Sequence, residues 1–253
     1  MTTPEGVPVP HPARAIALRP LVRLVQADIQ LSSPVSDPVK CLEALQSAFP
    51  AAELVLPTLT RRDGDGGESI YFALVNGRDS CALAESGIIV DTVAYHSWER
   101  FSSVIREVVG AIAAVTPTES TLVDLSYVDE ISRSSQDLPG ISGFQRYVRF
   151  PLMPDAGPFA EKVERSYGGY RFSTPDAVVR MEWSITEQTG LAAEHPLARF
   201  YEAPDEPALV MDWSAHVHGE DPVGSLEVGY KGISEVFWDA ITSDTREMMG
   251  LST

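Results

Sequence analysis

The chain has 253 residues, and its 44% hydrophobic content is enough to build a substantial core. Its 36 acidic and 19 basic residues give a formal net charge of −17 at pH 7, which disfavours a nucleic-acid binder, because phosphate contacts need a dense basic surface. A surface this negative favours a basic protein partner by steering its approach, and it also keeps a protein in solution.

Residues 1–19 contain several prolines and no periodic pattern, so we expect them to form a flexible arm. They lack the basic start and apolar run of a signal peptide, and no later stretch has the roughly 20 apolar residues of a membrane span. These features predict a cytoplasmic protein. Cys41 and Cys81 lie outside any metal or redox motif and are expected to be buried as small hydrophobic residues.

Residues 20–131 predict a first half with the order β-α-β-β-β-α-β. Apolar and polar residues alternate over residues 21–31, as in a half-buried strand. A short helix capped by Asp37 follows and ends at Pro50. The dipeptide Asn76-Gly77 is typical of a hairpin turn, and we expect it to join the first two strands of a three-stranded meander.

A long amphipathic helix is predicted from about Trp98, with Ser97 as its N-cap and apolar side chains at three- and four-residue steps as far as Val115. The alternation over residues 120–132 then indicates a strand. Residues 132–144 are rich in serine and glycine, and we place the boundary between the two halves there.

Residues 145–253 predict a second antiparallel half that ends in a covering helix at residues 233–250. The strand candidates are residues 144–152, 167–173, 177–187, 208–218 and 225–231. The predicted fold class is α+β, with antiparallel sheets that are each covered by helices, in two related β/α halves. The pattern is compatible with two separate sheets or with one continuous sheet.

A group of mostly aromatic residues gives the first half a resemblance to a known family. These residues are Phe49 and Pro50 at the end of the short helix, Tyr95, Trp98, Glu99 and Phe101 at the start of the long one, and Tyr127 in the following strand. In this arrangement the chain resembles an uncharacterised family of similar length, distributed sporadically in bacteria and archaea. The family usually has arginine and glycine before that tyrosine, where this chain has Val123, Asp124, Leu125 and Ser126. The resemblance implies a fold-level grouping and no activity.

The sequence contains none of the common catalytic or nucleotide-binding motifs. GxGxxG after a strand, GxxxxGK[ST], HExxH and GxSxG are all absent. A nucleophile and a base can still come together from distant positions, because such sites are defined by geometry and not by sequence order. No cofactor is predicted from motifs.

The segment "MDWSAHVHGED", residues 211–221, holds the strongest candidate site. Successive side chains of a strand point to opposite faces, so Asp212, His216 and His218 share a polar face, while Trp213 and its apolar neighbours face the core. The α-carbons of His216 and His218 would lie about 7 Å apart, close enough for both side chains to bind one divalent metal ion.

The strand at residues 177–187 repeats this pattern without histidines, with Arg180 and Glu182 on its polar face. If the two strands are neighbours, Arg180 and Glu182 lie near Asp212 and His216. A polar row opposite an apolar row is also typical of any antiparallel sheet with one face in solvent, and a cationic arginine beside the histidines disfavours a metal.

The favoured interpretation is a non-catalytic binding protein, of accessory, antitoxin or immunity type, whose acidic surface engages another protein of basic character. Neither a nucleic acid nor a membrane is expected as a partner. The alternative is an enzyme or small-ligand-binding protein with a pocket on the polar sheet face, with a metal ion in one version. The ligand-facing candidates are Arg180, Glu182, Asp212, His216 and His218, and the candidate metal ligands are His216 and His218.

Overall fold

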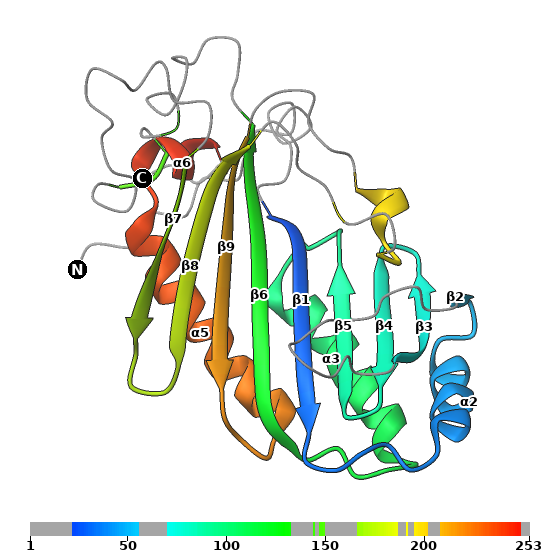
Figure 1. Cartoon of the computed structure of the whole chain (residues 1–253). Coiled ribbons are helices and arrows are strands. Elements are labelled where there is room, and N and C mark those ends of the chain that lie inside the picture. Colours follow the sequence, from blue (N-terminus) through cyan, green and yellow to red (C-terminus); the bar gives the residue numbers. More distant parts are fainter. Residues whose placement is uncertain are drawn as a thin grey trace, which may run out of the picture.

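The described strands β1 to β9 lie in one continuous sheet, and helices cover one face of it (Figure 1). The computed structural model describes residues 22–55, 70–132, 144, 147–149, 166–186, 191, 195–201 and 208–248. Within these ranges the sheet has nine strands, and all its neighbouring pairs are antiparallel. The α+β class predicted from the sequence is therefore confirmed.

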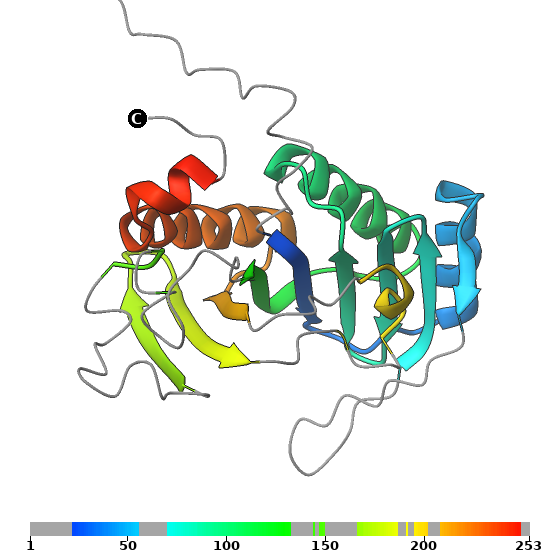
Figure 2. The same cartoon turned by 90° about the horizontal axis from the view of Figure 1, so that it is seen from above.

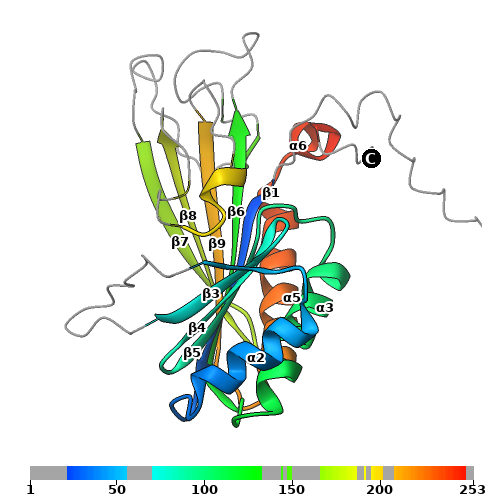
Figure 3. The same cartoon turned by 90° about the vertical axis from the view of Figure 1, so that its right-hand side faces the viewer.

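The order of the strands across the sheet places β1 and β6 near its centre. From one edge to the other, the strands are β2 (Glu53–Val55), β3 (Ile70–Asn76), β4 (Asp79–Ala84), β5 (Gly87–Thr92), β1 (Val22–Leu31), β6 (Ser120–Ser132), β9 (Ala208–Val217), β8 (Val178–Thr186) and β7 (Ser166–Ser173). The helices are α2 (Pro38–Ala48), α3 (Trp98–Ala113), α5 (Pro222–Ala240) and α6 (Ser243–Met248), with a short 3₁₀ helix η2 (Ala198–Phe200). The sheet is strongly twisted, and α2, α3 and α5 lie on the same side of it (Figure 3).

The two faces of the sheet differ because of strand parity, and we name them the covered face and the open face. On the covered face, alternate side chains of the central strands are buried beneath the helices. They include Val25, Ala27 and Ile29 of β1, Val123 and Leu125 of β6, and Met211, Trp213 and Ala215 of β9. The side chains between them point to the open face and are mostly polar.

The first two predicted helices and their caps are confirmed. The Asp37 carboxylate accepts a hydrogen bond from the Lys40 backbone N–H at 3.0 Å, at the start of α2. The Ser97 hydroxyl accepts one from the Arg100 N–H at 3.3 Å, at the start of α3. Both caps satisfy backbone donors that have no partner inside the helix.

The last long helix starts earlier than the sequence predicts. Residues 225–231, predicted as a strand, are helical, because α5 begins at Pro222 with the Asp221 carboxylate accepting from the Val223 N–H at 3.1 Å. Gly229 and Gly232 lie three residues apart on the buried face of this helix, which brings its backbone close to the sheet.

The predicted helix at residues 233–250 is also interrupted. Ile241 has an extended backbone and forms a β-bridge with Val148, so α5 ends before it and α6 begins at Ser243. This bridge is the only β-pairing in the described part of the predicted strand at residues 144–152. Residues 1–19, and the predicted boundary at 132–144 apart from its two end residues, lie outside the described residues.

A short segment between β8 and β9, residues 195–201, crosses the open face, and we name it the strap (Figure 2). Leu197 at its centre is fully buried. Its polar contacts are His195 Nε2 to Asp91 Oδ2 at 3.5 Å, Arg199 to Glu53 at 2.6 Å and the Tyr201 hydroxyl donating to Glu130 at 2.7 Å. The strap therefore covers part of the open face. No helix in the described ranges is long and apolar enough to cross a membrane.

The close packing of α5 makes Gly232 a sensitive position. A Cβ atom there would lie 3.2 Å from Val179 Cγ2, whereas one on Gly110, exposed on α3, would meet no atom within 4 Å. Gly232→Leu is expected to lower the free energy of unfolding by about 1–3 kcal/mol through overpacking. The same change at Gly110 should raise it by about 0.5–1 kcal/mol, because leucine favours a helix. Urea unfolding measures both, and equal effects at the two positions would contradict the packing.

Candidate functional site

Polar side chains from four strands line a hollow of about 210 Å³ on the open face. They come from β1, β6, β9 and β8, which are neighbours in the sheet. The lining residues are Gln26, Asp28, Asp124, Ser126, Arg180, Glu182, Asp212, Ser214 and His216. The hollow therefore combines four carboxyl groups with one arginine and one histidine.

The register of the strands explains why these residues meet. Ser126 of β6 pairs with Gln26 of β1 on one side and with Ser214 of β9 on the other, and Ser214 pairs in turn with Arg180 of β8. In the adjacent row, Asp124 pairs with His216. Cross-strand partners on one face lie about 5 Å apart at their Cβ atoms, so the rows form one continuous polar surface.

Four of the five residues predicted from the sequence lie in this hollow, namely Arg180, Glu182, Asp212 and His216. The pairing of β8 with β9, which was only a condition of the sequence argument, brings them together, since Glu182 lies directly opposite Asp212. His218 does not line the hollow. It lies beyond the end of β9, is exposed, and its Nδ1 is 3.1 Å from the Thr121 carbonyl oxygen.

The two histidines thus have different hydrogen-bond partners: Asp124 for His216 and the Thr121 carbonyl oxygen for His218. Within the described ranges, no group of three or more histidine, cysteine and acidic side chains is arranged to hold a metal ion. The metal site at His216 and His218 remains a prediction that the geometry does not favour.

His216 forms a hydrogen-bonded pair with Asp124, and the acidic partner was not identified from the sequence. The Asp124 carboxylate accepts from His216 Nδ1. A carboxylate is only an acceptor, so this bond holds the proton of a neutral imidazole on Nδ1 and leaves Nε2 as an acceptor. His216 Nε2 is buried and has no hydrogen-bond partner in the structure as described.

Two facing carboxyl groups, Glu182 and Asp212, form the most acidic part of the hollow. The pKa of Asp212 is raised from 3.8 to about 6, first because its surroundings limit hydration of the carboxylate and then because Glu182 is close. The Asp212 side chain as a whole is exposed, so solvent screens part of this repulsion.

A buried carboxyl group connects the hollow with the strap. Gln26 Nε2 donates to Asp91 Oδ1 at 2.9 Å, and Ser80 Oγ donates to Asp91 Oδ2 at 3.2 Å. His195 Nε2 of the strap lies against the same Oδ2 atom. His195 Nδ1 accepts a hydrogen bond from the Leu197 backbone N–H at 3.1 Å. Because Gln26 also lines the hollow, the position of the strap and the wall of the hollow depend on one carboxylate.

A second, more open hollow of about 550 Å³ lies beside the first toward the edge strand β7. The two share Glu182 and Asp212, so they form a continuous trough. Tyr167 of β7 is 88% exposed and lines this second part together with Gly168 and other residues of β7, β8 and β9. An exposed aromatic side chain therefore lies next to the acidic pair.

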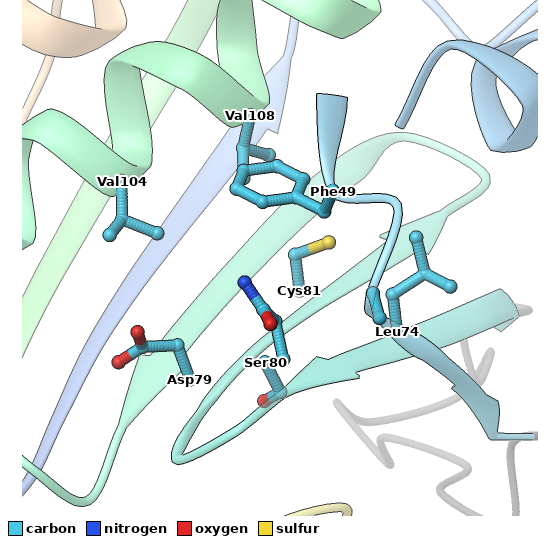
Figure 4. Close-up of a pocket in the computed structure, with 9 residues that line it drawn as sticks. Phe49, Leu74, Asp79, Ser80, Cys81, Val104 and Val108 are labelled. Carbon is cyan, nitrogen blue, oxygen red and sulfur yellow. The ribbon is translucent and has the colours of Figure 1, made fainter. Parts of the chain in front are cut away.

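A third pocket is small and apolar, and it lies on the covered face between α3, β3, β4 and the end of α2 (Figure 4). Its volume is about 40 Å³, and Phe49, Val104 and Val108 are among its lining residues. Cys81 also lines it, and burial raises the pKa of its thiol to about 12, so this cysteine is a protonated core residue. The pocket is too small for a ligand of more than a few atoms.

The sequence matches no model of a known protein family and no sequence among the curated proteins. The resemblance described from its aromatic residues therefore remains a prediction.

The raised pKa of Asp212 gives a testable pH dependence. The folded protein holds this proton more tightly than the unfolded chain, so the free energy of unfolding contains a contribution that falls as the pH rises from about 4 to about 6. Asp212→Asn removes this contribution. The free energy of unfolding of the variant minus that of the wild type should therefore be more positive at pH 7 than at pH 4. Denaturant unfolding at the two pH values measures the change, which solvent exposure keeps well below that of a fully buried group.

Glu182→Gln is the matched control. It removes the neighbouring charge, so the pKa of Asp212 should move back toward its ordinary value, as followed by the carboxyl carbon resonance in an NMR titration. An unchanged Asp212 titration in this variant would show that Glu182 does not act on it.

Proposed function

We propose that the protein is a non-catalytic binding protein that engages a basic segment of another protein in the acidic trough of the open face. The facing pair of Glu182 and Asp212 is the observation that carries this proposal. The pKa of Asp212 is raised first by limited hydration and then by repulsion from Glu182, and a cation bound between the two carboxylates relieves that repulsion.

The composition of the trough supports a cationic ligand. Asp28 and Asp124 add two further carboxyl groups, against the single guanidinium of Arg180. Ser126 and Ser214 supply hydroxyl groups that can accept hydrogen bonds from an ammonium or guanidinium group. The net charge of −17 attracts the same class of partner over a longer range.

The size of the trough favours a protein segment over a small amine. The hollow near His216 has room for one side chain, and the adjoining hollow offers Tyr167 as an exposed aromatic contact. Aromatic side chains beside charged pockets are common anchors in protein interfaces, and a tyrosine ring also attracts a cation. A short extended segment with two or more basic residues fits this combination.

We also infer that the two halves of the chain are related. With β6, which the sequence prediction placed in the first half, taken as the start of the second half, the strand order outward from the centre is β1-β5-β4-β3-β2 on one side and β6-β9-β8-β7 on the other. In one half β1 lies beside β5, the last strand of the meander β3-β4-β5, and the long helix α3 follows β5. In the other, β6 lies beside β9, the last strand of the meander β7-β8-β9, and the long helix α5 follows β9. This mirrored order supports an internal repeat, with the trough on the second half and the two central strands.

The cytoplasm remains the expected location.

A second candidate function rests on the pair of Asp124 and His216. A carboxylate that orients a histidine through Nδ1 leaves Nε2 able to take a proton, as in many enzymes with a general base. His216 Nε2 has no partner among the described groups, and the hydroxyl groups of Ser126 and Ser214 line the same hollow. An enzyme of this kind acts on a small ligand that enters the hollow.

Binding is tested with a hexapeptide of alternating arginine and lysine as the probe. The triple variant Asp124→Asn, Glu182→Gln, Asp212→Asn should bind it at least about tenfold more weakly in calorimetry, since tenfold corresponds to about 1.4 kcal/mol. Added salt should weaken binding to the wild type, because salt screens charges.

The control is a triple variant on the helical side, Glu107→Gln, Glu235→Gln, Asp239→Asn, which removes the same charge from exposed positions on α3 and α5. It should bind the peptide nearly as well as the wild type. An equal loss in both variants would show that only the net charge attracts the peptide, and the proposed site would then be wrong.

The enzyme alternative is tested with p-nitrophenyl acetate, a small activated ester. If His216 acts as a general base, the protein should accelerate hydrolysis over the buffer rate, and His216→Ala should reduce that acceleration about 10²-fold. His218→Ala, at an exposed histidine outside the hollow, is the control and should retain it. No acceleration by the wild type would leave binding as the function of the trough.

A further inference from the structure

Asp129 is an acidic residue on the covered face of the sheet, where it is 2% exposed. It lies on β6, paired with Val22 of β1 and with Met211 of β9. Met211 is fully buried, so the carboxyl group points into the core beneath the helices. Its Oδ1 atom has no hydrogen-bond partner in the described part of the chain.

The described titratable groups that interact with Asp129 are two tyrosines and one aspartate. The Tyr127 hydroxyl donates to the Tyr95 hydroxyl at 3.2 Å, and both tyrosines interact electrostatically with Asp129. On the helix side, Tyr230 of α5 acts on both tyrosines. The nearest cation along β1, Arg23, instead packs its guanidinium over the ring of Tyr201 in the strap, 5.0 Å from the centroid.

Trp213 is the one uncharged donor that acts directly on Asp129. Its indole N–H lowers the pKa of Asp129 as a hydrogen-bond donor does, yet Trp213 Nε1 is buried and makes no hydrogen bond of full geometry with any described group. Trp213 lies in register with Tyr127, the residue two positions before Asp129 on β6, so the indole and the carboxyl group share the covered face. A buried donor and a buried acceptor thus lie near each other without a hydrogen bond of full geometry between them.

Burial raises the pKa of Asp129 from 3.8 to about 7. After burial, the Trp213 indole N–H lowers this pKa, and Asp212, on the other face of β9, raises it. Asp129 is therefore a neutral acid in the folded protein below pH 7, and above it an anion with no cation partner among the described residues.

We propose that Asp129 and Trp213 form a proton switch on the covered face: when Asp129 releases its proton to solvent, its carboxylate takes the Trp213 indole N–H as a hydrogen-bond donor. An ionised carboxylate in a low-dielectric core needs such a donor, whereas the neutral acid does not. Trp213 packs edge-on against Phe237 of α5, with ring centroids 5.6 Å apart, so its movement is transmitted to that helix.

The acidic trough lies on the opposite face of the same strand, because Asp212 precedes Trp213 on β9 and points to the open face. A cation beside Asp212 offsets the negative charge that acts on Asp129, so Asp129 should then ionise at lower pH. By linkage, ionisation of Asp129 strengthens cation binding by the same factor. This link rests on the proposed function, whereas the switch itself does not.

The test is an NMR titration of the indole N–H resonances from pH 5 to pH 9, with the Trp213 signal among the four tryptophans assigned by Trp213→Phe. The Trp213 signal should shift downfield with a midpoint near pH 7, and Asp129→Asn should abolish this titration. Trp183, whose indole N–H is also buried without a partner, is the internal control and should not titrate. A pH-independent Trp213 signal in the folded wild type, or a titration that persists in Asp129→Asn, would overturn the proposal.

Two further measurements keep the outcome clear. In the wild type the urea midpoint should fall as the pH rises from 5 to 8, because the folded state holds the Asp129 proton more tightly than the unfolded chain. The NMR resonance of the Asp129 carboxyl carbon in the wild type should titrate near pH 7, and this measurement does not require the Asp129→Asn variant to fold. Repeating the indole titration with the basic hexapeptide bound should move the midpoint to lower pH. A Trp213 titration that the bound peptide leaves unchanged refutes the link and leaves the switch, while a peptide that does not bind refutes the proposed function alone.

Discussion

The antiparallel pairing of β1 with β6 is the constraint on which the rest of the structure depends. These two strands join the strands on either side of them into one sheet, and their register aligns the apolar residues of both on the covered face. Because side chains alternate, the same register aligns Gln26 with Ser126 and Asp28 with Asp124 on the open face. The core and the polar trough are thus two results of one pairing, and a slip by one residue would destroy both.

Much of the second half of the sheet could be predicted from local patterns. Parity alone identified Trp213 as a core residue, and the repeat of its pattern at residues 177–187 pointed to a related strand, which the structure shows to be its neighbour. From that pairing followed the correct grouping of Arg180, Glu182, Asp212 and His216. Helix caps such as Asp37 and Ser97 were also predictable, because they depend only on residues a few positions away.

What the sequence could not supply depends on long-range register. Asp124 and His216 are 92 positions apart, and only the pairing of β6 with β9 makes them partners. The same holds for Gln26 and Asp91, which are 65 positions apart. The start of α5 was missed for a different reason: residues 225–231 alternate in polarity like a strand, and the glycines that pack this helix on the sheet carry no apolar signal.

The contact between Gln26 and Asp91 determines which atom Gln26 presents to the trough. A carboxylate oxygen accepts hydrogen bonds, so the amide nitrogen of Gln26 faces Asp91 and the amide oxygen is left for the other side. The buried aspartate therefore orients a glutamine that does not itself carry charge. Through this orientation the lining of the trough gains one more acceptor, and an incoming group with several N–H donors, such as a guanidinium, meets acceptors on β1 as well as on β8 and β9.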